Sequence, residues 1–227
     1  MWSTCARSGA EQAFHIPRQS TLMQDLEHIA QRIQDSLEEK DTVREIAIKS
    51  SRALIRMSSG VVHGMHKGID GEDALAEAID EAHKLKSVLA EHVEIWHSGI
   101  VQDALVEVAE AAILNALVKG QELPDPVHLG MPGTAYLLGI ADTIGELRRF
   151  SLESLRRGDI SSAERYLDLM EELFLVIMRF DYPDAIISIR RKQDIARSVL
   201  EKTRGDVSLA VMSERLHGRM GDLEKKL

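Results

Sequence analysis

Two long stretches of the chain, residues 18–123 and 133–182, contain no proline, and this narrows the possible folds more than any other feature. Both stretches are rich in Ala, Leu, Glu, Lys and Arg, and their apolar residues recur at intervals of three and four, which is typical of amphipathic helices. Only 4% of the residues are aromatic, whereas strands favour aromatic and β-branched side chains. The sequence therefore predicts an all-α fold, a single seven-helix bundle domain, and argues against a sandwich or barrel.

The helical pattern divides into seven segments. The predicted helices cover residues 20–39, 41–66, 72–97, 100–119, 134–157, 161–180 and 184–203. The segment 120–133 contains three of the five prolines and is the clearest predicted loop. Ser161 with Glu164 has the spacing of a capping box and predicts a helix start there.

The ends of the chain are less regular than its middle. Residues 1–20 lack helical periodicity and are predicted to be a peripheral extension, with the helical domain at 21–227. The polar tail from Gly205 is expected to form a short helix or to fray. The single cysteine, Cys5, excludes an internal disulfide framework and a cysteine-based zinc finger. No run approaches the roughly 18 consecutive apolar residues of a membrane span, so we expect a soluble, cytoplasmic protein.

Two predicted helices carry carboxylates where the pattern predicts burial. Residues 104–118 are apolar nearly all round, yet they include Glu107 and Glu110, which are three apart and share a face. In the next helix Asp142 and Glu146 are four apart in similarly apolar surroundings. An unpaired buried carboxylate costs on the order of several kcal/mol, so such groups are paired, protonated or bound to metal. Neither residues 104–118 nor residues 136–147 include a basic residue.

Four carboxylates on two facing helices would form a hard, oxygen-only, negative site that suits Mg²⁺ or Mn²⁺ and not zinc. A metal ion there lowers the pKa of bound water and stabilises charge on a transferring phosphoryl group. The small residues Ala109, Ala141 and Gly145 are expected to let the two helices and a substrate approach closely. Helical acids with this spacing are also common on solvated faces, so both interpretations stay open at this point.

A basic stretch occupies the second predicted helix. Residues 40–67 carry a net charge of +4 in a chain whose formal net charge is -9, so the remainder carries -13. By their spacing Lys49, Arg52 and Arg56 share one face, and Arg44 lies close to it. The same face continues with Ser59, His63 and His66. A row of cations beside hydroxyls suits a phosphate backbone, and an ordinary solvated face is the alternative.

Other candidate sites are weaker. The group of His92, Glu94 and His97 and the pair of His63 and His66 do not have a zinc-hydrolase spacing. The cationic run at 190–192 is interpreted as a solvated face. The sequence contains no P-loop, dinucleotide fingerprint or serine elbow, which argues against nucleotide-dependent and serine-hydrolase classes.

Several blocks of the sequence resemble the translin/Trax family. The most recognisable is GTAYLLGIADTIGELRRF at 133–150, followed by Gly158 and Asp159. Supporting matches are FDYPDAIISIRRK at 180–192 and LVEVAEA at 105–111, with Arg44 and Arg52 in the second helix and further residues between 201 and 209. The resemblance covers roughly residues 25–210.

The resemblance implies a seven-helix fold that assembles into a closed, hollow octamer enclosing RNA. It also implies that Trax-type chains are metal-dependent endoribonucleases, whereas translin-type chains bind nucleic acid and lack the full acid set. At the matching positions, the implied catalytic and metal-binding residues are Glu107, Glu110, Asp142 and Glu146. All four acids are present, so the resemblance implies a Trax-like Mg²⁺-dependent endoribonuclease.

An internal site would reconcile the negative net charge with RNA binding, because the basic face would point inward. On this hypothesis the RNA backbone is bound by Arg44, Lys49, Arg52 and Arg56. Two alternatives remain: a non-catalytic, translin-like protein that binds RNA or single-stranded DNA, and a helical regulatory adaptor that binds metal and a membrane transporter.

Overall fold

The computed structural model describes residues 19–224, and helices are the only regular secondary structure in that range. They are α1 (Gln19–His66), α2 (Glu72–Val88), α3 (Val93–Trp96), α4 (Gly99–Lys119), α5 (Gly133–Arg156), α6 (Ile160–Ile177) and α7 (Arg190–Glu224). The prediction of an all-α, seven-helix fold is therefore confirmed. Cys5 and nearly all of the predicted N-terminal extension lie outside the described residues. Within the described part, no helix is both long and apolar enough to cross a membrane.

The first two predicted helices are one continuous helix, so the predicted break near Lys40 is wrong. No glycine or proline occurs between residues 19 and 59, and nearly all residues there are compatible with helix. The helix ends at His66, and Gly68 then adopts φ +72°, a left-handed conformation that favours glycine.

The predicted helix 72–97 is instead two helices separated by a turn. Here the N–H of His92 donates to the carbonyl of Leu89 at 3.0 Å, and the N–H of Ile95 then donates to the carbonyl of His92. Leu89 is buried, so packing holds a turn that no glycine or proline marks in the sequence. This explains why periodicity alone did not reveal the break.

The last helix begins later and ends later than predicted. It starts at Arg190, after an irregular segment that contains Pro183, and it runs through Gly205 to Glu224. The buried amide of Gln193, in the first turn of α7, donates to the carbonyls of Ile177 and Phe180 at 2.8 Å and so ties the start of α7 to the end of α6.

The start of α6 also differs from the predicted capping box. The N-cap is Asp159, whose carboxylate accepts from the N–H of Ser162 at 3.0 Å. The side-chain hydroxyl of Ser161 also points to Asp159. An aspartate satisfies the free N–H groups of the first turn in the same way as the predicted serine would.

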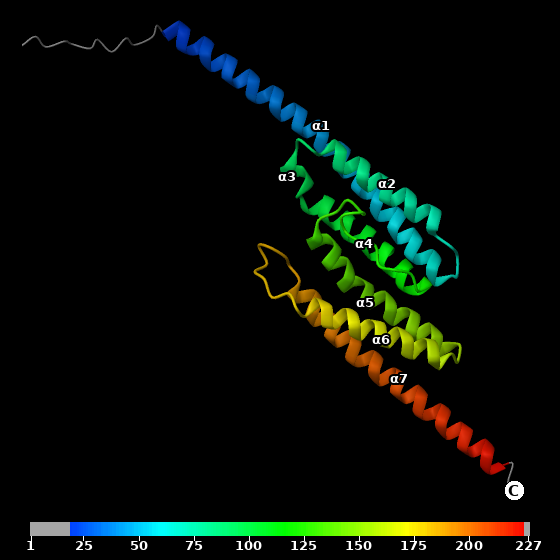
Figure 1. Cartoon of the computed structure of the whole chain (residues 1–227). Coiled ribbons are helices and arrows are strands. Elements are labelled where there is room, and N and C mark those ends of the chain that lie inside the picture. The colour runs from blue at the N-terminus through cyan, green and yellow to red at the C-terminus, as the bar shows by residue number, and fades with distance from the viewer. Residues whose placement is uncertain (1–18, 225–227) are drawn as a thin grey trace, which may run out of the picture. The chain divides into compact units, whose positions relative to one another are not determined.

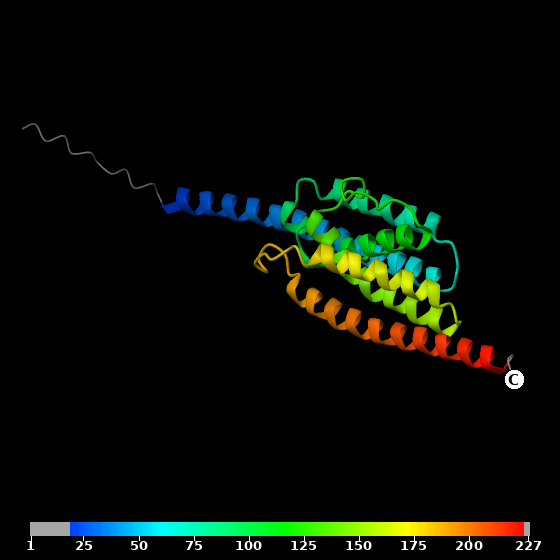
Figure 2. The same cartoon turned by 60° about the horizontal axis from the view of Figure 1, so that its bottom comes forward.

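The helices of the larger unit, residues 43–227, pack around α4 and α5. As Figures 1 and 2 show, α4 lies between α2 and α5, and α5 also packs against α6 and α7. The exposed face of α4 is narrow, since twelve of its residues are buried. The core continues on the second half of α1 through Leu54 and Val61.

The first half of α1, residues 19–42, belongs to a unit separate from the rest of the described helices. This segment presents an exposed apolar seam made of Met23, Leu26, Ile29, Ile33 and Leu37. Independently, the end of α7 presents a second seam made of Leu209, Met212, Leu216, Met220 and Leu223. Both seams have the spacing of threes and fours by which helices pack on other helices.

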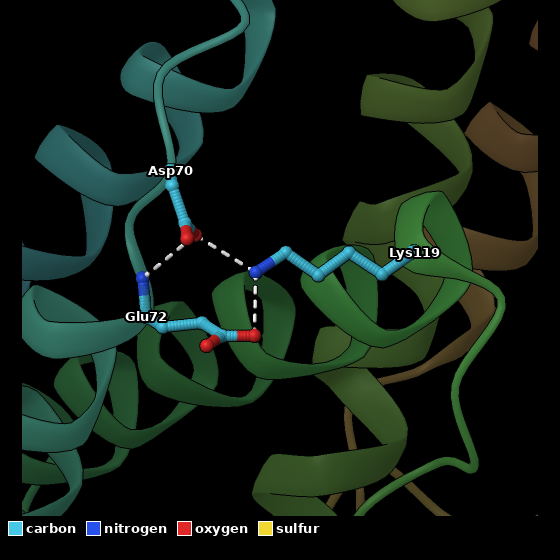
Figure 3. Close-up of polar contacts among 3 residues, drawn as sticks. All are labelled: Asp70, Glu72 and Lys119. Atoms are coloured by element: carbon cyan, nitrogen blue, oxygen red, sulfur yellow. Dashed lines mark hydrogen bonds and ion pairs between the residues drawn. The ribbon is translucent and has the colours of Figure 1, made fainter.

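An ion triad connects the end of α4 to the turn between α1 and α2 (Figure 3). The ammonium of Lys119 lies 2.8 Å from a carboxylate oxygen of Asp70 and 2.6 Å from one of Glu72. These contacts lower the pKa of Asp70 and raise that of Lys119. The lysine also lies in the last turn of α4, where a cation favours the helix dipole, and Gly120 then ends the helix at φ +68°.

Candidate acidic site and basic helix face

The helices α4 and α5 come into backbone contact at Gly139. A Cβ atom at this position would lie 3.0 Å from the backbone nitrogen of Glu110 and 3.1 Å from the carbonyl oxygen of Val106. The sequence predicted such a contact at Ala109, Ala141 and Gly145. Ala109 does lie in it, but a Cβ on Gly145 would meet nothing within 4 Å, so the expected helix contact at Gly145 is wrong.

The four predicted acids project from the two helices at this contact. Glu107 and Glu110 lie on α4, and Asp142 and Glu146 lie on α5; each is half-buried, not fully buried as the pattern predicted. The charges of neighbouring acids change the pKa values of Glu107 and Glu110. Burial and the charges of the other three acids raise the pKa of Glu110 to about 8. Burial and then the charge of Asp142 raise the pKa of Glu107. Both shifts make the two carboxyl groups on α4 harder to ionise than free glutamates.

The ammonium of Lys192 on α7 pairs with Asp142. It donates to both carboxylate oxygens at 2.5 Å, and each side chain is 30% exposed. Its positive charge also lowers the pKa of Glu107 and of Glu110, against the larger raising effects. The sequence interpretation of residues 190–192 as a solvated face is therefore wrong for Lys192, which is the counter-ion of the acidic site.

The imidazole of His66 pairs with Glu146. Its Nε2 lies 2.5 Å from a carboxylate oxygen of Glu146, and its ring stacks on Phe150 with centroids 4.1 Å apart. The hydrogen bond from His66 lowers the pKa of Glu146, although burial acts in the opposite direction. Arg149 approaches the same carboxylate to 3.8 Å. The aromatic ring of Phe150 thus holds the imidazole in place. The side chain of His66 is only 7% exposed.

The second half of α1 brings the basic face to the acids. The hydroxyl of Ser59 lies 3.5 Å from a carboxylate oxygen of Glu107, and His66, two turns later, reaches Glu146. Toward the N-terminus, the same face carries Lys49, Arg52 and Arg56, all exposed. Within the described residues these three cations form no ion pair with a carboxylate, whereas Arg44 pairs with Glu45 at 3.5 Å. Acids and basic face, far apart in sequence, are therefore neighbours in the fold.

The arrangement of the acids is not a preassembled metal site. Among the described residues, no three His, Cys, Asp or Glu side chains are grouped closely enough to hold a metal ion. The group of His92, Glu94 and His97 is therefore not a metal site either. Lys192 and His66 instead provide the compensating contacts of two acids. The donor set is nevertheless one of carboxylate oxygens, which hard divalent cations prefer.

Sequence reasoning missed the roles of Lys192 and Gly139 and did not connect His66 with Glu146. Lys192 lies 50 residues from Asp142, and no local spacing links them. Gly139 sits within the recognisable block of α5, and its lack of a side chain beside an apolar helix was the available signal. For His66 the signal was its position on the basic face.

One family model matches most of the chain, and one curated protein is similar to it over a comparable length. The model of the translin family matches residues 20–204. Among curated proteins, the uncharacterized protein MJ0175 of Methanocaldococcus jannaschii is 36% identical over 184 residues, which are 79% of this chain and 82% of that protein.

Solved structures show the same helical arrangement. The structure of an AfC3PO–duplex RNA complex is similar with a TM-score of 0.75 and 31% identity, over 81% of this chain and 97% of that one. The crystal structure of AfC3PO has the same TM-score and coverage with 32% identity. Apo-NeC3PO has a TM-score of 0.70 over 80% of this chain and 96% of that one, and at 21% identity it supports the fold alone.

Proposed function

Because this chain belongs to the translin family, we propose that it is a Trax-like, metal-dependent endoribonuclease that binds RNA through its basic helix face. One observation carries the proposal: α1 places its cationic face directly beside four carboxylates, and burial together with neighbouring acids raises the pKa of two of them, Glu107 and Glu110. The similarity to AfC3PO, which has been solved with duplex RNA, adds support for the class of substrate.

The metal would be held by Glu107, Glu110, Asp142 and Glu146. The raised pKa of Glu110 supports this assignment. Burial and three neighbouring acids disfavour its ionised form, and a bound divalent cation would stabilise that form. When bound, Mg²⁺ or Mn²⁺ would supply an activated water and charge stabilisation at the phosphodiester. Lys192 would have to leave Asp142, and the half-buried position of both side chains gives it room to do so.

The remaining residues have roles that follow from their positions. Lys49, Arg52 and Arg56 would hold backbone phosphates without reading bases, since no aromatic side chain is interleaved with them. Arg44 would extend this face, although it shares its charge with Glu45. Ser59 and His66 lie between the cations and the acids and would orient Glu107 and Glu146.

Cleavage of a short labelled RNA tests the proposal. The protein is incubated with Mg²⁺, with Mn²⁺ or with EDTA, beside Glu110→Gln, Asp142→Asn and the exposed control Glu172→Gln on α6. We expect metal-dependent cleavage that is lost in the two site variants and kept in the control. Folding of each variant is checked by circular dichroism. Wild-type cleavage by a folded Asp142→Asn protein would refute the assignment.

A non-catalytic, translin-like binding protein is the second candidate. The pairing of Asp142 with Lys192, and the lack of a preassembled metal group among the described residues, favour it. Binding of RNA without metal-dependent cleavage would establish this alternative. The regulatory-adaptor hypothesis would lead only if the protein neither bound nor cut RNA.

We also propose that the chain forms a homo-oligomer, an octamer on the family resemblance. The exposed seam on the last turns of α7 supports a helix-mediated interface, because five large apolar side chains there are uncovered in a single chain. Light scattering of Leu209→Glu/Leu216→Glu tests this. A lower mass than the wild type is expected, and an unchanged mass would rule out this seam as an interface.

A further inference from the structure

A surface cavity of about 490 Å³ opens directly beside the pair formed by His66 and Glu146. Apart from Leu152, the cavity is lined by His66, Gly145, Arg148, Arg149, Glu153 and Arg156. All but His66 belong to α5. The cavity is therefore lined mainly by one helix face, which continues the face that carries the acids of that helix.

The cavity is open because of Gly145. A Cβ atom at this position would have nothing within 4 Å, so no side chain fills the space between His66 and the arginines. At Gly139 the missing side chain lets two helices touch, but at Gly145 it leaves room at the surface. The volume is sufficient for a phosphate group with part of its sugar.

The wall carries a net positive charge with two accessible guanidinium groups. Arg148 donates hydrogen bonds to Thr203 and Asp206, so its guanidinium is already engaged by α7. The side chain of Arg149 is 57% exposed and approaches Glu146 only to 3.8 Å. Arg156 is 76% exposed and pairs with Glu153 at 2.6 Å. Exposed arginines at the edge of a cavity retain donors for an anion, and a planar guanidinium matches phosphate oxygens.

Charge changes sign along this face of α5. Asp142 and Glu146 are followed by Arg149 and Arg156, at intervals that keep all four on one side of the helix. On α1 the order is complementary: the cations Lys49 to Arg56 come first, then Ser59 beside Glu107, and His66 at the cavity. The acids therefore lie between two cationic surfaces.

We propose that this cavity binds a backbone phosphate of the RNA strand, on the far side of the acids from the basic face of α1. The inference rests on the proposed RNA-binding function and deepens it. One strand would be held at both ends of the acidic site, so that an internal phosphodiester is placed at the acids. Arg149 and Arg156 are the residues that contact the phosphate.

Salt-dependent binding of a fluorescein-labelled RNA, followed by anisotropy in EDTA so that no cleavage occurs, tests the proposal. The variants are Arg149→Gln, Arg156→Gln and the double variant. Arg204→Gln is the matched control, because it removes the same charge from an arginine that is 54% exposed and paired with Glu171. Each lost phosphate contact lowers the slope of log affinity against log salt by about 1.

We expect the double variant to bind more weakly than the control and to lose about 1 to 2 from the magnitude of that slope. Affinity and slope equal to those of Arg204→Gln would overturn the cavity proposal while leaving RNA binding by the protein intact. An absence of binding by the wild type would instead overturn the proposed function and the cavity together. Added inorganic phosphate separates the sources of the anion, since competition only by millimolar phosphate with unchanged variant slopes would indicate a free-phosphate site and refute a backbone contact.

Discussion

A Cβ atom on Gly139 of α5 would lie 2.6 Å from the Cβ of Ala109 on α4, closer than two carbon atoms in separate side chains can approach. The two helices therefore touch at the point from which the acids project. Glu110 follows Ala109 directly, and Asp142 lies three residues after Gly139, so this contact sets the separation of acids on the two helices.

Gly139→Ala tests this contact. The added methyl group cannot be accommodated without moving backbone, since Glu110 N and Val106 O lie at 3.0 and 3.1 Å. We expect a loss of about 1–3 kcal/mol in the free energy of unfolding, measured by urea denaturation. Gly145→Ala is the control, because its Cβ would meet open space. We expect it to be neutral or stabilising by up to about 1 kcal/mol, and equal losses in the two variants would contradict the proposed contact.

Glu110 makes stability depend on pH in the metal-free protein. Its pKa is about 8 in the folded state and near 4.5 when unfolded. Between these values the folded state binds more protons than the unfolded state, so this group stabilises the fold at low pH and that contribution is lost as pH rises toward 8. The slope for one group is at most about 1.4 kcal/mol per pH unit.

Urea denaturation in EDTA between pH 5 and pH 8 measures this dependence. We expect the wild type to lose stability relative to Glu110→Gln as pH rises, because the amide cannot ionise. A constant difference between the two proteins over this range would show that Glu110 ionises as it does in the unfolded chain.

Lys192→Gln tests whether the lysine and a divalent cation compete for Asp142. Removal of the ammonium leaves a half-buried carboxylate without its partner, so we expect a lower melting temperature in EDTA. We expect Mg²⁺ to raise the melting temperature of this variant more than that of the wild type, because the metal no longer displaces a cation. Differential scanning fluorimetry without RNA gives both quantities. The exposed lysine variant Lys202→Gln on the same helix is the control, and an equal Mg²⁺ response in all three proteins would exclude competition.

His66→Phe tests the hydrogen bond to Glu146 while keeping an aromatic ring against Phe150. The histidine lowers the pKa of Glu146 below its usual 4.5. That pair therefore contributes stability above pH 4.5, and the contribution is lost as pH falls through the lowered pKa. We expect the variant to be less stable than the wild type by about 1 kcal/mol at pH 6, with a smaller difference at pH 3. Denaturation at both values measures it, and a difference that grew toward pH 3 would contradict this account.

The local sequence was sufficient to predict helices whose ends are marked by proline, glycine or a change in apolar periodicity. The predicted helices 100–119 and 134–157 match α4 and α5 within one residue at each end, because proline, glycine and apolar periodicity act over a few neighbouring residues. The same signals did not mark the turn at Leu89–His92 or the late start of α7. Leu89 is buried at the turn, and the amide of Gln193 joins the start of α7 to the end of α6; both depend on partners that only the packed helices supply.

The sequence by itself also indicated the four acids and the cations of α1, since each set has a spacing that places its members on one helix face. Only the tertiary structure decided that these faces meet, that Lys192 pairs with Asp142 and His66 with Glu146, and that Gly139 and Gly145 differ. The physical reason is distance along the chain. Lys192 and Asp142 are 50 residues apart, and His66 and Glu146 are 80 apart. Such pairs form when helices pack, and helical periodicity carries no information about them.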